Sequence, residues 1–237
     1  MKKTFTLLFV LTLLFSGISS AFAFPMSKSN ESGDYLWGTG IAHSLSAGVY
    51  GGSTERDVKI GLSTVTKESE KAIVYMAVDL QPWLLLFGGI GGANHALGLS
   101  ADSSAMQAEA GLLVNLVDHD ILDPTLFEDK LRVNIGATWG LTQGEWFGED
   151  IKWQELTAFA TVSVVNDTVG NKFFNPNSIA IYVGPVFSYI QSEDIEVDQE
   201  LGYMAGVEVF VSESISFDLG IRQFDGPGFE GGLHIRF

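Results

Sequence analysis

Apolar residues occupy every second position along much of this chain. In the segment 131–142, the odd-numbered positions are apolar: Leu131, Val133, Ile135, Ala137, Trp139 and Leu141. The even-numbered positions between them hold arginine, asparagine, threonine or glycine. Successive side chains of a β-strand point to opposite faces, so this pattern predicts strands with one apolar and one polar face. Ten such segments are found, at 45–49, 74–80, 84–93, 107–116, 131–142, 155–164, 179–189, 201–211, 215–222 and 229–237.

Ten is an even number, so the first and last strands can pair antiparallel and close the sheet into a barrel without edges. Short links are expected at one end of this barrel, at 81–83 and 212–214. Polar loops are expected at the other end, at 61–70, 96–104, 143–150, 192–200 and 225–228. The links at 118–130 and 167–177 are long for the short-link end, so eight strands are the alternative. The predicted fold is an all-β antiparallel barrel over residues 37–237.

Alternation alone does not separate a membrane barrel from a soluble, lipocalin-like barrel, in which the apolar face points inward. Arginines discriminate between the two, because an arginine facing the bilayer midplane costs roughly 2–4 kcal/mol. Three of them, Arg132, Arg222 and Arg236, fall within strands opposite the apolar face. The lysines are expected in loops, turns or strand ends: Lys28, Lys59, Lys67, Lys71, Lys130, Lys152 and Lys172. Aromatic residues near strand ends fit the girdles of a membrane barrel: Trp83, Trp139, Tyr189, Phe224 and Phe237. A transmembrane barrel is therefore predicted.

The last segment ends the chain on an aromatic residue, with Phe229, Gly231, Leu233, Ile235 and Phe237 on one face. This strand resembles the closing strand of bacterial outer-membrane barrels, and the pattern over residues 40–237 resembles the small OmpA-like and opacity-type barrel family. The resemblance implies that an assembly machinery reads Phe229, Leu233, Ile235 and Phe237. It also implies that outer-membrane lipids and lipopolysaccharide surround the barrel.

The first residues have the features of an export signal. Lys2 and Lys3 precede the mostly apolar segment 5–18, and Ala21 and Ala23 fit the small residues of a cleavage site. Polar residues after position 15 make the apolar stretch shorter than the roughly 20 residues of a membrane-spanning helix. Cleavage after Ala23 is expected, which leaves 24–36 as a short periplasmic segment before the barrel.

Composition excludes some classes of partner. The chain has a formal net charge of −16, and residues 1–23 contain two lysines and no acid, so the remainder carries −18. Such acidity argues against nucleic acid as a partner, because phosphate binding needs a basic surface. The chain has no cysteine, which argues against disulfides and thiolate-bound metals. No cofactor or metal site is predicted.

The polar face of the predicted strands carries charges of both signs. These could line an ion path, or they could pair with one another and close the lumen, because charges buried in a narrow barrel persist only when paired. Bulky Phe159, Tyr182 and Phe210 share this face and favour a closed lumen. The predicted lumen network is Asp79, Glu109, Arg132, Glu155, Glu208, Asp218, Arg222, Glu230, His234 and Arg236.

Two segments contain residue types that catalytic sites use. His95 precedes Ser100, Asp102, Ser103 and Ser104, so a His–Ser pair of a lipid hydrolase is conceivable, although these residues are ordinary in loops. Asp118-His119-Asp120 is similar to part of the site of omptins, which are outer-membrane proteases. It falls on the short-link end, the wrong end for that chemistry, so a solvated turn is favoured. No catalytic residue is predicted.

Two further segments were considered for binding. Gly88-Gly89-Ile90-Gly91-Gly92 has no following Lys-Ser/Thr, so a phosphate loop is unsupported, and glycines in a strand usually allow bending or close packing. An acidic run could bind divalent cations bridging lipopolysaccharide, but a solvated loop is favoured: Glu193, Asp194, Glu196, Asp198 and Glu200.

The sequence therefore predicts an outer-membrane barrel with a closed lumen and a structural or surface-interaction role. A narrow channel is the first alternative, and an outer-membrane lipid or peptide hydrolase the second. The surface ligand is not identified.

Overall fold

The computed structural model describes residues 45–60, 63–97, 103–121, 129–146, 149–166, 178–192, 195–212 and 214–237. Several sequence predictions lie outside these residues: the export signal with Ala21 and Ala23, the segment 24–36, Lys28, Lys172, Ser100, Asp102, Glu193 and Asp194. No helix of the described residues is long and apolar enough to cross a membrane.

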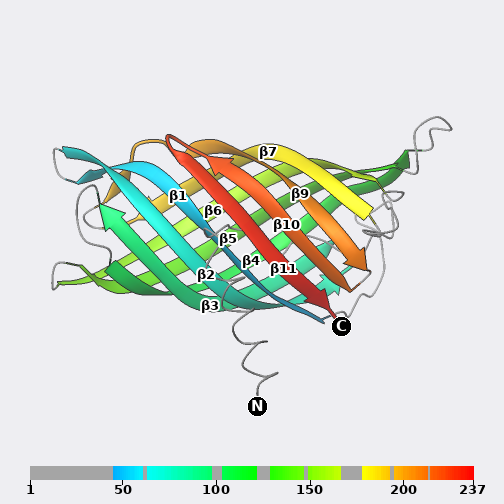
Figure 1. Ribbon diagram of the computed structural model, residues 1–237, viewed down its shortest axis with the longest axis horizontal. Coiled ribbons are helices and arrows are strands. Elements are labelled where there is room, and N and C mark those ends of the chain that lie inside the picture. Colours follow the sequence, from blue (N-terminus) through cyan, green and yellow to red (C-terminus); the bar gives the residue numbers. More distant parts are fainter. Residues whose placement is uncertain are drawn as a thin grey trace, which may run out of the picture.

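Ten long strands form one closed antiparallel barrel (Figure 1). They are β1 (Leu45–Ile60), β2 (Ser63–Gln81), β3 (Leu84–Leu97), β4 (Ser103–Ile121), β5 (Asp129–Trp146), β6 (Glu149–Asn166), β7 (Ser178–Gln191), β9 (Leu201–Ser212), β10 (Ile215–Gln223) and β11 (Pro227–Arg236). Each pairs with its neighbours along the chain, and β11 pairs with β1. The prediction of ten strands is confirmed, and the alternative of eight strands is wrong. An additional strand of two residues, β8 (Glu196–Val197), lies in the β7–β9 connection.

Burial alternates along most of the long strands, and large apolar residues are exposed on the outer face. On β2, Tyr75 is 1% exposed, whereas its neighbours Val74 and Met76 are 63% and 66% exposed. The same phase holds on β7, where Tyr182 is buried and Ile181 and Val183 are exposed. The buried face includes arginines, carboxylates and hydroxyls. The barrel is therefore the reverse of a soluble barrel: its polar face is inside.

The strands extend further than the alternating apolar pattern indicated. Residues 63–70, predicted as a loop, belong to β2, so that Lys67 and Lys71 lie within a strand and face the lumen. Most of 143–150 likewise belongs to β5 and β6. These predictions were wrong because backbone pairing continues beyond the apolar positions, where the outward face becomes polar, as at Glu68 and Glu70.

The far end of the barrel, opposite the end where Leu45 and Phe237 lie, has an uneven rim. The strands β1 to β6 have 14 to 19 residues, whereas β9, β10 and β11 have 12, 9 and 10. Pairing of β1 with β11 ends at Thr54, opposite Gly228. Beyond it, β8 takes the place of β11 and pairs Val197 with Val58.

An apolar cap forms where β8 crosses the rim. It consists of Val58, Trp153, Ile190, Ile195 and Val197, all of them buried. Lys59 and Asp198 form an ion pair on the exposed side of this crossing. The cap therefore holds the β7–β9 connection against β1.

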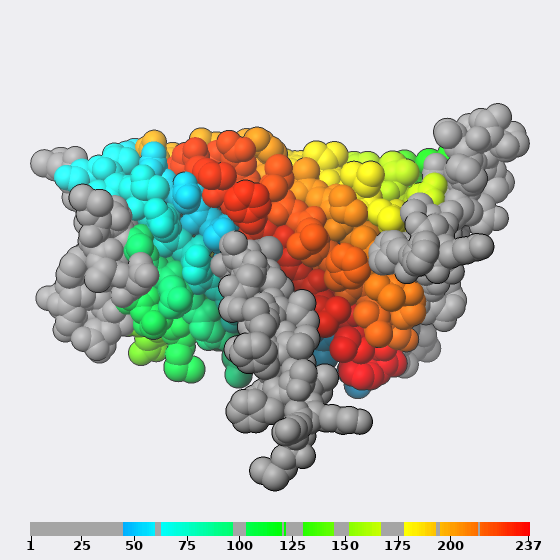
Figure 2. Space-filling view, in the orientation of Figure 1, coloured from blue at the N-terminus to red at the C-terminus, as the bar shows by residue number. Residues whose placement is uncertain are grey.

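The seam between β1 and β11 is rich in glycine. Gly51 lies opposite Gly231, Gly48 opposite His234, and Tyr50 opposite Gly232. Figure 2 shows β11, in red, running diagonally between β1 and β10. A Cβ atom added at Gly48 would lie 2.3 Å from the carbonyl oxygen of Leu233, so this position has no room for a side chain.

The glycine cluster of β3 offers a matched pair of substitutions. A Cβ atom at Gly91 would lie 1.8 Å from the carbonyl oxygen of Ala72, whereas at Gly92 the nearest atom is 3.9 Å away. We expect Gly91→Ala to lower the free energy of unfolding by about 1–3 kcal/mol, because the adjacent backbone must move. The control Gly92→Ala should stay within about 0.5 kcal/mol of the wild type. Urea unfolding of both variants measures this, and equal stabilities would contradict the close approach at Gly91.

Candidate functional site

All ten residues of the predicted lumen network lie on the inner face of the barrel. Glu155 and Arg236 are half-buried, and the others are buried. The structure divides the lumen into three charged groups. The terminal cluster is Asp79, Asp118, Arg132 and Arg236. The central cluster is Glu208, Asp218, Arg222, Glu230 and His234. The vestibule group is Arg56, Lys67, Lys71, Glu109 and Glu155.

The terminal cluster joins two arginines to two aspartates near the end where the chain finishes. Nη2 and Nε of Arg132 lie 3.0 and 3.2 Å from Oδ2 of Asp118, and both side chains are almost fully buried. Arg236 lies 3.6 Å from a carboxylate oxygen of Asp79. The buried charges of this end are therefore present as pairs of opposite sign.

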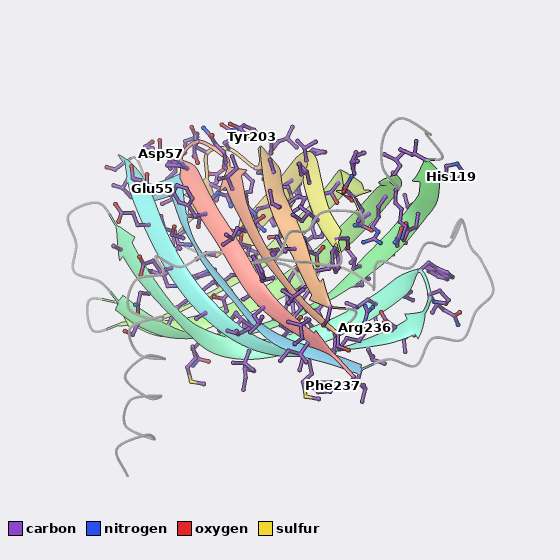
Figure 3. All side chains as sticks on the ribbon, turned by 45° about the vertical axis from the view of Figure 1, so that its right-hand side comes forward. Glu55, Asp57, His119, Tyr203, Arg236 and Phe237 are labelled. Atoms are coloured by element: carbon purple, nitrogen blue, oxygen red, sulfur yellow. The ribbon has the colours of Figure 1, made fainter. Side chains whose placement is uncertain are left out.

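The position of Asp118 corrects the prediction of a solvated turn at 118–120. The residue belongs to β4 and is 0% exposed. The register of β4 against β5 shifts between Asn115 and Val117. Up to Asn115 the odd-numbered side chains of β4 point into the barrel, and after the irregularity the even-numbered ones do. Asp118 is therefore inside, and His119 is exposed at the barrel end (Figure 3). Only the bulge makes Asp118 the partner of Arg132, and the alternation of residues gives no sign of it.

The central cluster is a set of hydrogen-bonded carboxylates. Glu230 accepts from Arg222 at 3.0 Å and from the hydroxyl of Tyr182 at 3.2 Å. His234 contacts Asp218 at 2.7 Å through Nε2 and Tyr75 at 2.5 Å through Nδ1. Glu208 accepts from Ser216 at 3.0 Å. Each carboxylate therefore has a donor, which is what buried acids require.

Aromatic rings pack together on the inner face of the barrel. The apolar cluster there includes Tyr50, Tyr75, Phe87, Phe159 and Tyr182. The ring centroids of Tyr50 and Tyr75 are 5.6 Å apart, and those of Tyr75 and Phe87 are 6.4 Å apart. We call these five residues the aromatic plug.

Glycines on facing strands make room for the plug. A Cβ atom at Gly136 would lie 2.2 Å from the ring of Phe159, and one at Gly111 would lie 2.5 Å from Phe87. Phe210, which the sequence also placed inside, is buried in a smaller cluster with Val165 and Ala180.

Above the plug lies a cavity of about 40 Å³ that reaches the vestibule group. Glu109 contacts Tyr50 and Lys71 and accepts from Gln107 at 2.6 Å. Arg56 donates to Ser188 at 2.8 Å and lies 3.8 Å from Glu155. Arg56 was missed by the sequence analysis because the first strand was recognised only over 45–49.

Phe224 also lines this cavity, which corrects its assignment to an outer girdle. Its ring is 7% exposed, and the guanidinium carbon of Arg56 lies 4.2 Å from its centroid. The even-numbered side chains of β10, such as Arg222, point into the barrel, and Phe224 continues this pattern just after the strand. Trp139, Tyr189 and Phe237 are exposed on the outside.

Among the described residues of the candidate hydrolase group, the side chain of His95 makes no hydrogen bond with Ser103 or Ser104. Nδ1 of His95 lies 2.8 Å from the hydroxyl of Ser69, a residue not considered from the sequence, and Ser104 donates instead to Asn94. Within the described part of the chain, Nε2 of His95 has no hydrogen-bond partner, so no acid orients the ring. Nor do any three of the described histidines and acids gather closely enough to hold a metal ion.

No model of a known protein family matches the chain, and no curated protein matches it in sequence. Several solved structures are similar in architecture. An outer-membrane channel of Pseudomonas putida F1 is 12% identical, with 87% of this chain and 99% of that chain covered and a TM-score of 0.39. Neisserial surface protein A is 11% identical, with coverage of 82% and 97% and a TM-score of 0.38. The transport unit of the autotransporter AIDA-I from Escherichia coli is 11% identical, with coverage of 86% and 94% and a TM-score of 0.37.

Proposed function

We propose that this protein is an integral β-barrel of the bacterial outer membrane, of the small barrel type, with a closed lumen and a structural or surface-interaction role. The observation that carries the proposal is the inverted burial of the barrel. Large apolar side chains are exposed on the outside, while carboxylates and guanidinium groups are buried inside. A water-facing barrel would lose the hydrophobic stabilisation of all these apolar side chains, whereas lipid solvates them.

The extent of the apolar outer face supports a membrane. On β11 it runs from Phe229 to Phe237, and on β9 from Leu201 to Val211. These lengths match the 9–11 residues with which a tilted strand crosses a bilayer. On β2 the apolar face ends at Ala72, and exposed Glu70 and Glu68 follow toward the far end. The outer surface thus has an apolar belt with a polar border.

The resemblance of the last strand to the closing strand of outer-membrane barrels supports one orientation. In it, the end with Leu45 and Phe237 lies in the periplasm, and the far end, with its longer strands, lies outside the cell. Figure 3 shows Glu55 and Asp57 at the end opposite to Arg236 and Phe237. Lipopolysaccharide would then surround the polar border, and the far rim would face the medium.

The packing of the lumen supports closure. Five aromatic side chains occupy its middle, and ion pairs lie on both sides of them, at Arg132–Asp118 and at Arg222–Glu230. A closed barrel leaves its rim as the surface on which a partner can bind, displayed by a rigid scaffold. The proposed role is therefore one of display rather than transport or hydrolysis.

A conductance measurement tests the closed lumen. We expect the purified barrel, inserted into planar lipid bilayers, to show no steady single-channel current, because the aromatic plug and paired charges fill the path. Insertion is checked independently by protease protection of the barrel in vesicles. Steady currents that vanish on replacing Arg132 or Glu208 would establish the narrow channel instead.

A further inference from the structure

We infer that the vestibule binds a compact anion, a halide or the carboxylate group of a short acid, between Lys67, His95 and Arg56. This site goes beyond the proposed display role and does not depend on it, because an anion can bind above the plug whether or not the lumen conducts.

The charges that line the cavity are unequal in number. Four cationic side chains reach it, Arg56, Lys67, Lys71 and Arg222, and two carboxylates, Glu109 and Glu155. Lys71 pairs with Glu109, Arg56 lies near Glu155, and Arg222 pairs with Glu230 below the cavity. With Glu230 included, three carboxylates serve four cations, so one buried cation is in excess. Glu155 attracts both Arg56 and Lys67 but lies within 4.0 Å of Arg56 only, and no described carboxylate lies within 4.0 Å of the amino group of Lys67.

The register of β1 against β2 brings two of these cations close together. Arg56 of β1 lies directly opposite Lys67 of β2, and both side chains face the lumen, 4% and 5% exposed. Like charges directly opposite each other in a sheet are destabilising. The two cations diverge onto different rings: Arg56 stacks on Phe224, and the amino group of Lys67 lies 4.8 Å from the centroid of Trp153. An anion between them would convert the repulsion into two attractive contacts.

His95 brings its second ring nitrogen, Nε2, to the same place. Its ring meets Trp153 edge-on, with centroids 4.6 Å apart, so His95 and Lys67 contact the same indole. The hydroxyl of Ser69 is in hydrogen-bond contact with Nδ1. When that hydroxyl donates, the ring proton resides on Nε2, which is buried and has no partner among the described residues. A buried donor without an acceptor costs free energy, which an anion would recover.

The size of the cavity suits a compact ligand. One water molecule needs roughly 10–15 Å³ of such volume, so about 40 Å³ has room for a few waters. Chloride, bromide or a single carboxylate group would replace one or two of them.

The test is anion titration of the full barrel in detergent, with camphorsulfonate, a bulky anion without a carboxylate, holding ionic strength constant. We expect bromide, formate or both to raise the unfolding temperature saturably, and Lys67→Met to weaken the apparent affinity by at least about tenfold, since a charge-assisted contact is lost. The matched control is Lys59→Met, which removes an exposed lysine of the same sheet and should leave the affinity unchanged. Saturation by bromide alone identifies a halide site, and saturation by formate alone a carboxylate site.

Crystals of the wild-type barrel soaked in bromide provide a second measurement that needs no variant. We expect an anomalous peak within contact distance of the Lys67 amino group and Nε2 of His95 if the site accepts halides, and formate density there if it accepts carboxylates. The inference is overturned if neither anion gives saturable stabilisation or density at that place, or if Lys67→Met titrates like the wild type.

Discussion

Replacing Arg132 with alanine is expected to lower the free energy of unfolding by about 3–5 kcal/mol, because the carboxylate of Asp118 would remain buried without its cation. The pair lies where the barrel offers no water to either group, with the two side chains 2% and 0% exposed. Reversible urea unfolding of the barrel in lipid vesicles measures the loss.

A double variant separates the charge from the volume it fills. Asp118→Leu with Arg132→Met replaces the pair by apolar side chains, and we expect most of the lost stability to return, because no unpaired charge remains. If the double variant is as unstable as Arg132→Ala, packing rather than charge accounts for the loss. If Arg132→Ala itself unfolds like the wild type, the pair does not stabilise the barrel.

Deleting Phe237 is expected to abolish most of the membrane-inserted barrel in cells. The backbone amide of Phe237 donates to the carbonyl oxygen of Leu45 at 2.8 Å, so the residue closes the β1–β11 pairing at its last position. Its side chain is 77% exposed on the outer face, where an assembly factor can reach it. The measurement is the amount of protein with heat-modifiable migration on gels of outer-membrane fractions.

Leu219→Ala is the matched control for the deletion. Leu219 is also exposed on the apolar belt, at 59%, but it lies in the middle of β10. Its replacement removes apolar surface without touching the terminal strand, so assembly should remain near wild-type levels. Normal membrane levels after deletion of Phe237, or equal loss in both variants, would refute a special role for the last residue.

Alternation of residue types was sufficient to predict the fold, because a barrel in lipid imposes one solvent on each face of every strand. The inward or outward direction of Tyr75, Arg222 and Tyr182 follows from counting in twos. The closing pairing of β1 with β11 follows from the even number of strands. The first prediction needs only the local alternation of residues, and the second needs only the number of alternating segments.

The candidate site depended on features that local alternation does not encode. A bulge in β4 changed the direction of Asp118 and created the partner of Arg132. The meeting of Lys67 and His95 on Trp153 joins three strands, β2, β3 and β6, and depends on their stagger around the barrel. Strand ends were underestimated because polar residues outside the apolar belt can pair as strands or form loops, and their types do not distinguish the two.

The glycine-rich seam has a consequence for how the cylinder forms and opens. Where Gly51 faces Gly231, the two strands share backbone hydrogen bonds but no side-chain contact. Cross-strand side-chain pairs are a main source of specific stability between strands, and they also penalise a shifted register. The seam joins the strands that are most distant in the sequence. Its glycines reduce the number of side-chain pairs between these two strands. We therefore expect this junction to close last during assembly and to separate first on heating.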